Sequence, residues 1–136
     1  MVKKIILATM SYFVITMAIS YPWFLIWFKA DYELMGAVTR PEPIMPFGTA
    51  AMIIQGIVIA YLFSFYRKQV QGNPIVLGVK FSLIAGLLVA TVMVLATAAK
   101  INIEPVNQFL LLTSAHQFLQ FFLTGIALGF IYSRGE

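Results

Sequence analysis

One histidine and the polar residues around it have the widest chemical scope in this chain. His116 is the only histidine, and it lies in an uncharged run over residues 109–132. In a helix each residue is rotated by about 100° from the one before it, so several polar residues of this run fall within an arc of about 100° and form a polar stripe. The stripe consists of Thr113, His116, Gln117, Gln120 and Thr124. Because imidazole can carry a proton, ligate a metal or bind a polar head group, the stripe predicts either a ligand site or a set of interhelical hydrogen bonds.

The residues available to assist this stripe exclude most enzyme chemistry. The chain has no cysteine, which excludes disulfides, thiolate metal sites and a cysteine nucleophile. Its apolar runs contain no Asp, Glu or Arg and no Lys deeper than Lys80, so they offer no carboxylate pair for acid–base catalysis and no Ser-His-Asp constellation. One histidine also provides too few ligands for haem or a di-iron centre. We therefore expect no enzymatic activity, no metal site and no cofactor.

The elements that must position these residues are membrane helices. The 136 residues are 61% hydrophobic and 10% charged, whereas soluble domains contain about 25% charged residues. At about 1.5 Å per residue, roughly 20 apolar residues cross a bilayer. The sequence therefore predicts an all-α integral membrane protein with a single domain over residues 1–136. We expect a four-transmembrane-helix bundle with spans at about 5–28, 46–66, 76–99 and 109–132.

Polar residues of the other spans are expected to join the stripe. Gln55 lies near the middle of the second span, where a lone amide requires a hydrogen-bonding partner on another helix. Ser20, Gln55, Thr91 and His116 would lie at a similar depth, about 12 Å from one end of their helices. They predict a polar patch inside the bundle, covered by the connection over residues 29–45. The candidate ligand-binding residues are His116, Gln120, Gln117, Gln55 and Thr113.

Small residues mark the faces on which these helices are expected to pack. Gly125 and Gly129 form a GxxxG pair on the side of the fourth span opposite the polar stripe. Gly56 belongs to a mostly small edge of the second span that also contains Gly48, and Gly86 marks a similar face on the third. We expect helix packing at these glycines. A GxxxG pair serves contacts within one bundle as readily as contacts between chains, so it leaves the oligomeric state open.

Two local features are expected beyond the middle of the first span. Pro22 removes a helical hydrogen bond and predicts a kink. The following segment, residues 29–45, holds the densest charge of the chain, including Asp31, Glu33 and Arg40. Two acids at positions i and i+2 supply too few oxygen ligands for a divalent cation. We interpret the segment as an interfacial charged loop; the alternative is a metal or substrate site.

The basic residues predict the orientation of the spans. With four spans, both termini share one side of the membrane. That side would hold Lys3, Lys4, Arg67, Lys68, Lys80 and Arg134, and the other side Lys29, Arg40 and Lys100. Because cytoplasmic loops carry the excess of Lys and Arg, we expect both termini in the cytoplasm. The expected location is the inner (plasma) membrane of a bacterium, and the net charge of +4 is interpreted as a topology signal rather than as a nucleic-acid site.

Two functions of different class are compatible with this pattern. In the first, which we favour from the sequence, the chain is a structural or accessory membrane subunit that packs through its small-residue faces. In the alternative, it is a small-ligand-binding or transport protein whose polar intramembrane pocket surrounds His116, Gln120 and Gln55. The first predicts paired amides and a closed pocket, and the second predicts a polar cavity. The expected partners are the lipid bilayer and either further copies of the chain or a larger membrane complex.

Overall fold

The computed structural model describes residues 1–37 and 41–134, and the secondary structure within these ranges is helical, without strands. The helical segments are α1 (Val2–Pro22), η1 (Trp23–Trp27), α2 (Lys29–Leu34), α3 (Met45–Gln69), α4 (Pro74–Ala90), η2 (Thr91–Ala96), α5 (Thr97–Lys100) and α6 (Val106–Ser133). They form four stretches long and apolar enough to cross a membrane: Val2–Trp27, Met45–Gln69, Pro74–Lys100 and Val106–Ser133. The prediction of an all-helical chain with four such helices is confirmed. Arg40 and Glu136 lie outside the described residues.

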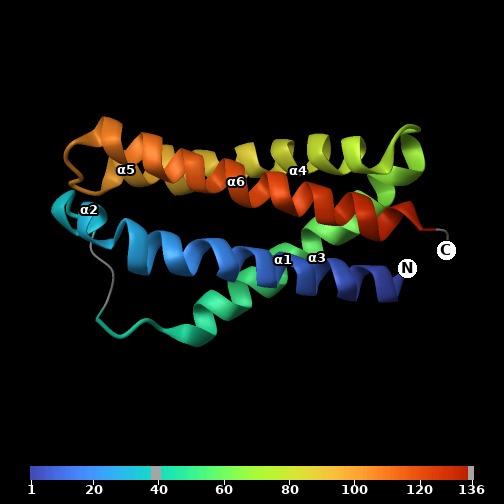
Figure 1. Ribbon diagram of the computed structural model, residues 1–136, viewed down its shortest axis with the longest axis horizontal. Helices are drawn as coiled ribbons and strands as arrows, with labels where there is room; N and C mark the ends of the chain where they lie inside the picture. Colours follow the sequence, from blue (N-terminus) through green and yellow to red (C-terminus); the bar gives the residue numbers. More distant parts are fainter. Residues whose placement is uncertain (38–40, 135–136) are drawn as a thin grey trace.

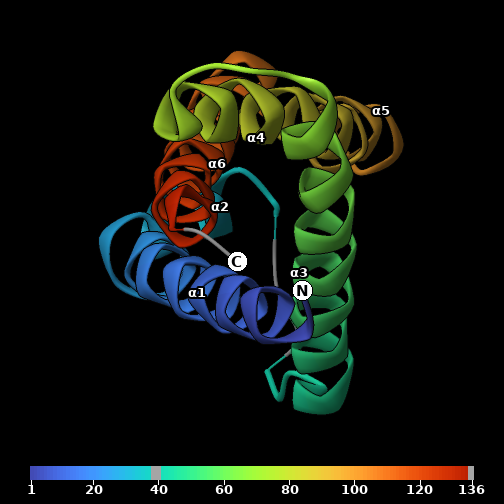
Figure 2. The ribbon, with the colours of Figure 1, turned by 90° about the vertical axis from the view of Figure 1, so that its right-hand side faces the viewer.

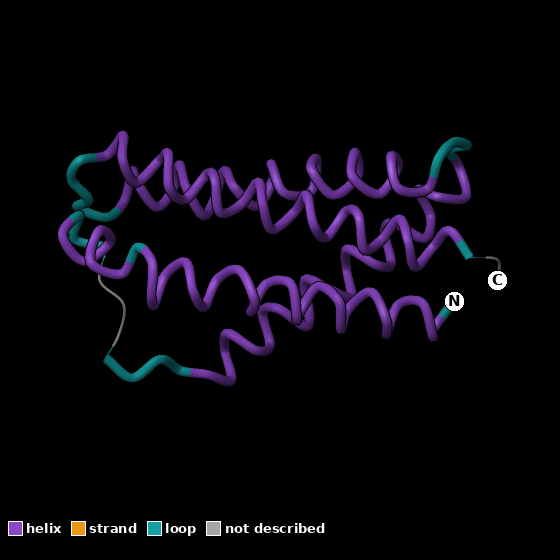
Figure 3. Tube along the Cα trace, viewed as in Figure 1, coloured by secondary structure: helices purple, strands orange, loops and turns teal. Residues whose placement is uncertain are grey.

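The four long stretches run lengthwise between two ends of the molecule (Figure 1). One end, called here the terminal end, holds the N-terminus, residue 134 and the turn between α3 and α4. The opposite end, called the distal end, holds α2 and the connection between α5 and α6 (Figure 3). Helix α3 runs obliquely to the other three, and its distal half diverges from them (Figure 2). The bundle is therefore tight at the terminal end and wider toward the distal end.

Glycines set the closest helix contact, which is between α4 and α6. A Cβ atom on Gly125 would lie 2.6 Å from Val79 Cα, and one on Gly78 would meet the backbone of Gly125 and Gly129. Such approach of two backbones requires residues without side chains. Ser82 on α4 adds a buried hydrogen bond by donating to the Phe121 carbonyl at 2.7 Å. The GxxxG pair is thus occupied by a contact inside the chain.

The glycines of α3 show how this helix diverges. At Gly56, where α3 crosses α1, a Cβ atom would lie 3.1 Å from Thr9 Cγ2. At Gly48, two turns toward the distal end, a Cβ atom would meet nothing within 4 Å. The prediction that Gly48 takes part in helix packing is therefore wrong, because contact between α3 and α1 ends near their crossing point.

Two buried apolar clusters correspond to the two ends of the bundle. The terminal cluster contains Ala8, Tyr12, Ile59, Ala60, Phe63, Leu77, Phe121, Leu128 and Tyr132. The distal cluster contains Tyr32, Met35, Val94, Ile103 and Phe109. Tyr32 and Met35 belong to α2 and to the residue that follows it, so this short helix covers the distal end. The charged segment is partly helical, and its Lys29 and Glu33 form an exposed ion pair at 4.0 Å.

Two of the long stretches change helix type in their distal halves. The first passes from α1 into the π-helical η1 directly after Pro22, and Phe28 N–H donates to the Trp23 carbonyl at 3.1 Å. The third passes from α4 into the π-helical η2 at Thr91. A π turn accommodates an extra residue and is frequent at functional sites. The change of helical winding thus begins directly after Pro22, where we expected a kink.

Candidate polar cavity

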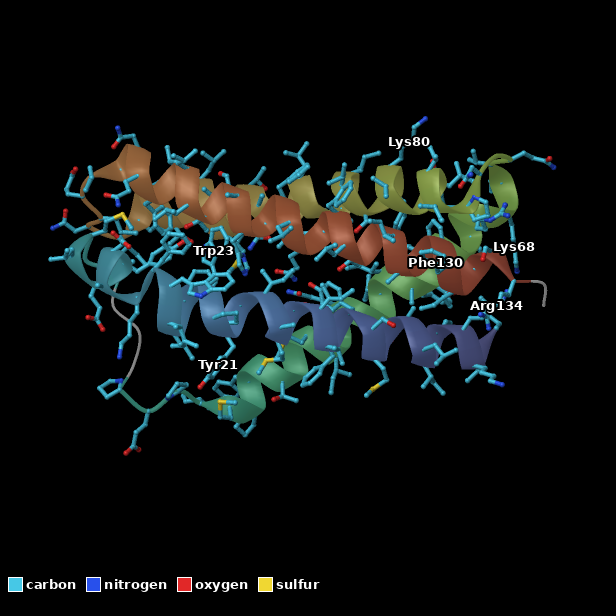
Figure 4. All side chains as sticks on the ribbon, in the orientation of Figure 1. Tyr21, Trp23, Lys68, Lys80, Phe130 and Arg134 are labelled. Atoms are coloured by element: carbon cyan, nitrogen blue, oxygen red, sulfur yellow. The ribbon has the colours of Figure 1, made fainter. Side chains whose placement is uncertain are left out.

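His116 is held in the distal half of the bundle by the first stretch. Its side chain is buried, and its Nε2 lies 2.9 Å from Ser20 Oγ on α1. Two aromatic rings of η1 flank the imidazole, with centroid distances of 4.7 Å to Phe24 and 5.8 Å to Trp23. Figure 4 shows Trp23 between the first stretch and α6, whereas Tyr21 points away from α6. The π-helical segment therefore provides the aromatic walls around the histidine.

The second ring nitrogen of His116 also contacts a polar side chain. Its Nδ1 lies 3.5 Å from Gln117 Nε2. Both ring nitrogens are therefore in contact with polar atoms, Nδ1 with Gln117 and Nε2 with Ser20.

A second polar group, one helical turn toward the terminal end, links three helices. Gln120 Nε2 donates to Thr16 Oγ1 at 2.9 Å and to Tyr12 Oη at 3.2 Å. Tyr12 Oη in turn donates to Gln55 Oε1 on α3 at 2.6 Å. The chain of bonds runs from α6 through α1 to α3, and it satisfies both amide protons of Gln120.

A third polar group closes the distal side. Thr113 Oγ1 lies 3.0 Å from Tyr32 Oη, and Trp23 Nε1 donates to the same phenol oxygen at 3.3 Å. The Tyr32 ring packs against Phe24 and Phe109, with centroid distances of 5.0 and 6.2 Å. Helix α2 thus connects to the polar stripe through one tyrosine.

These three groups surround a cavity of about 200 Å³ to which all four long stretches contribute. Its walls are formed by Tyr12, Thr16, Ser20, Phe24, Ala51, Met52, Gln55, Val89, Met93, Thr113, His116, Gln117, Gln120 and Phe121. Both polar and apolar side chains line the cavity, and none of them belongs to Asp, Glu, Lys or Arg. The divergence of α3 creates this space, since a parallel α3 would bring its side chains into the centre of the bundle.

Two further depressions adjoin the cavity through shared wall residues. A depression of about 200 Å³ at the distal surface is lined by Lys29 and Glu33, and it shares Phe24, Met93 and Thr113 with the cavity. A mainly apolar groove of about 360 Å³ lies between α4 and α6. The groove shares Gln117 and Phe121 with the cavity. The cavity therefore adjoins a depression with two charged residues at the bundle end and a mainly apolar groove on the bundle side.

Most polar atoms around the cavity are paired, but one buried oxygen of its wall is not. Among the described residues, Gln117 Oε1 has no hydrogen-bond partner. A buried acceptor without a partner usually costs about 1–3 kcal/mol. Gln117 lies in the wall between the cavity and the apolar groove, so its unpaired oxygen marks a position where a ligand donor would be stabilising.

The structure brings all five sequence-predicted binding residues to this cavity. His116, Gln117, Gln120 and Thr113 are buried on α6, whereas Gln55 is exposed because the divergence of α3 leaves its side chain uncovered. Thr91, which we expected in the same patch, is exposed and donates to the Leu88 carbonyl at 2.7 Å. That expectation is wrong, because Thr91 bonds within its own helix and faces outward.

Two tyrosines of the cavity region were missed from the sequence. Tyr12 recurs with Thr16 and Ser20 at intervals of four residues, and this stripe on the first stretch could have indicated a polar face opposite α6. Tyr32 gave no such signal, because it lies in the charged segment.

Among the described residues, no cluster of three or more His, Asp or Glu side chains could hold a metal ion.

Comparison with known proteins gives no match for this chain. No protein-family model, no curated protein and no solved structure matches it. A function therefore has to follow from the geometry and chemistry of the cavity.

Proposed function

We propose that this protein spans a membrane with its four apolar helices and binds a small, uncharged, amphipathic molecule in the polar cavity. Both termini would face the cytoplasm, since most of the basic residues lie toward the terminal end. The inner membrane of a bacterium is the location we expect. The observation that carries the proposal is the cavity of about 200 Å³, which all four long stretches line and to which the first, second and fourth contribute polar side chains.

The chemistry of the walls defines the class of ligand. No charged side chain lines the cavity among the described residues, so a charged ligand would lose its hydration without gaining a counter-ion. Phe24 and Phe121 offer flat apolar surface, while His116, Gln117 and Gln120 offer hydrogen-bonding groups. A ring or short chain that carries hydroxyl or carbonyl groups satisfies both requirements, as in most small-molecule sites.

The adjoining apolar groove suggests how such a molecule is oriented. Gln117 and Phe121 form the boundary between cavity and groove, so a polar head in the cavity can continue into an apolar tail between α4 and α6. The groove opens on the side of the bundle, where exposed Leu87 and Phe118 would contact lipid. A ligand dissolved in the membrane therefore has an apolar path to the cavity.

One observation favours the second candidate function, a structural or accessory subunit. The amide protons of Gln120 are already paired with Thr16 and Tyr12, as expected for polar residues that hold helices together. In that case the cavity would be an unused gap, and the protein would act through contacts with other chains. The two candidates differ in what remains bound when the protein leaves its membrane.

Native mass spectrometry of the protein, released from its own membrane in mild detergent, tests the proposal. We expect the wild-type chain to carry one small organic molecule in stoichiometric amount. Ala51→Leu adds bulk to a residue of the cavity wall without removing a hydrogen bond, and it should abolish this mass. Ala50→Leu is the matched control, because Ala50 is the preceding residue, is exposed like Ala51 and does not line the cavity.

Two results would contradict ligand binding. A wild-type spectrum without any additional small mass, or with a mass that Ala51→Leu leaves unchanged, would remove the cavity as a binding site. A stable complex with other chains that is indifferent to Ala51→Leu would instead support the accessory function. A ligand found in wild type and in Ala50→Leu but not in Ala51→Leu would identify itself by its mass.

A further inference from the structure

The Lys4 ammonium lies against the Tyr132 ring at the terminal end, far from the polar cavity. Lys4 Nζ donates to the Arg134 carbonyl at 2.7 Å and lies 5.6 Å from the centroid of the Tyr132 ring. Tyr132 Oη in turn donates to the Ala60 carbonyl on α3 at 3.1 Å. The first and last helices therefore meet α3 at this point. Lys4 belongs to the first helix, and Arg134 directly follows the last one.

Arg67 lies on the face of α3 that is directed toward the end of α6. It follows Phe63 by one helical turn, so the two side chains project from the same face of α3. The Phe63 ring contacts Tyr132 edge to face, with a centroid distance of 5.1 Å, which places that face of α3 toward the end of α6. Arg67 is half-buried, and its buried Nε has no hydrogen-bond partner among the described residues. A guanidinium in this position requires an acceptor.

The charge distribution indicates the nature of that acceptor. The described acidic residues lie toward the distal end, in α2 or in the segments that precede α3 and α6. They are Asp31, Glu33, Glu42 and Glu104. The terminal end carries Lys3, Lys4, Arg67, Lys68 and Arg134, and Figure 4 shows Lys68 and Arg134 close to this end. Glu136 lies outside the described residues. The described surface therefore presents several cations and no carboxylate at one end of four apolar helices.

We propose that Lys4, Arg67 and Arg134 form a binding site for the phosphodiester group of an anionic membrane lipid of the phosphatidylglycerol type. The planar guanidinium of Arg67 offers Nε–H and Nη–H donors in the fork geometry that matches two phosphate oxygens. Lys4 supplies a further positive charge beside the Tyr132 ring. In an inserted chain the terminal end lies at the membrane surface, where lipid phosphates are located. The site is independent of the polar cavity.

The test uses the full-length chain in mixed micelles that contain equal amounts of phosphatidylglycerol and phosphatidylcholine with the same acyl chains. Native mass spectrometry then counts the lipids retained by the protein. We expect wild type to retain phosphatidylglycerol in preference, and Arg67→Gln to reduce this preference about fivefold, the effect of about one basic residue near a membrane surface. Lys80→Gln is the matched control, because Lys80 is an exposed cation that Figure 4 shows pointing outward from α4.

A second variant and a competitor complete the design. Lys4→Gln should lower the preference in the same direction, and the unfolding midpoint of each variant in detergent verifies that it is folded. Adding inorganic phosphate in excess should not displace the retained lipid, since the acyl chains contribute to binding. Equal retention of the two lipids by wild type would overturn the proposal. So would an equal loss in Lys80→Gln and Arg67→Gln, which would indicate general surface charge, or displacement by phosphate, which would indicate a site for the free ion.

Discussion

Replacing Gly125 by alanine should force α4 and α6 apart. The new Cβ atom would lie 2.6 Å from Val79 Cα and 2.8 Å from the Gly78 carbonyl oxygen, whereas ordinary contacts begin at 3.4 Å. The obstacles are backbone atoms, so no side-chain rotation can relieve the overlap. The two helices must separate locally by about 0.8 Å, the difference between 2.6 and 3.4 Å.

The energetic effect of this separation follows from the close packing of the pair. A gap of about 0.5–1 Å forfeits a quarter to a half of the dispersion energy of each contact. The hydrogen bond of 2.7 Å from Ser82 to the Phe121 carbonyl would lengthen as well. Overpacking of this kind typically destabilises a protein by about 1–3 kcal/mol. We therefore expect Gly125→Ala to lower the free energy of unfolding by about 2 kcal/mol.

Equilibrium unfolding with sodium dodecyl sulfate in dodecyl maltoside micelles provides the measurement. Tryptophan fluorescence is a suitable signal, because Trp23 lies against His116 of α6. The matched control is Gly48→Ala, since a Cβ atom there would meet nothing within 4 Å. In a helix this control should be neutral or stabilising by up to about 1 kcal/mol. Equal stability of Gly125→Ala and Gly48→Ala would refute the argument that the α4–α6 contact depends on missing side chains.

Three further substitutions each remove one hydrogen-bonding side-chain group. Tyr12→Phe removes the phenol oxygen that links Gln120 to Gln55, and it should lower the free energy of unfolding in the same titration by about 1 kcal/mol; an unchanged value would show that this bond is replaceable. Asn73→Ala removes the side-chain cap of α4, at a cost of about 1 kcal/mol, and should accelerate amide exchange in the first turn. Unaltered exchange there would contradict the cap. Ser82→Ala should destabilise the chain by about 0.5–1.5 kcal/mol, less than Gly125→Ala, because the backbones keep their spacing.

The long helices and the polar stripe of α6 could be predicted because they depend on local patterns. A run of apolar residues long enough to cross a bilayer is visible in the sequence, and the angular positions of Thr113, His116, Gln117 and Gln120 follow from helical geometry. The structure places these four side chains on one wall of the cavity. This part of the site lies on one helix, so no knowledge of helix packing was needed.

The remaining wall depends on how helices cross, which the sequence does not specify. Gly48 and Gly56 have the same pattern, yet only Gly56 lies at a crossing. Thr91 was expected in the same polar patch, but no neighbouring helix covers it and it is exposed. Gly78 was not singled out, although it meets both glycines of the GxxxG pair. In each case the orientation of a neighbouring helix determined the outcome, and residue spacing within one helix carries no information about it.

The position of α6 in the chain has a consequence for biosynthesis. Of the four apolar helices, α6 has the lowest hydropathy and the largest buried share, since its polar stripe faces its neighbours. It is also the last to leave the ribosome. In the proposed membrane location, Ser20, Thr16 and Tyr12 of the first helix would already be present to pair with His116 and Gln120 when α6 is inserted. The least apolar helix would thus be made after the helix that supplies hydrogen-bonding partners for its polar side chains. The order of the helices in the sequence therefore suits their assembly.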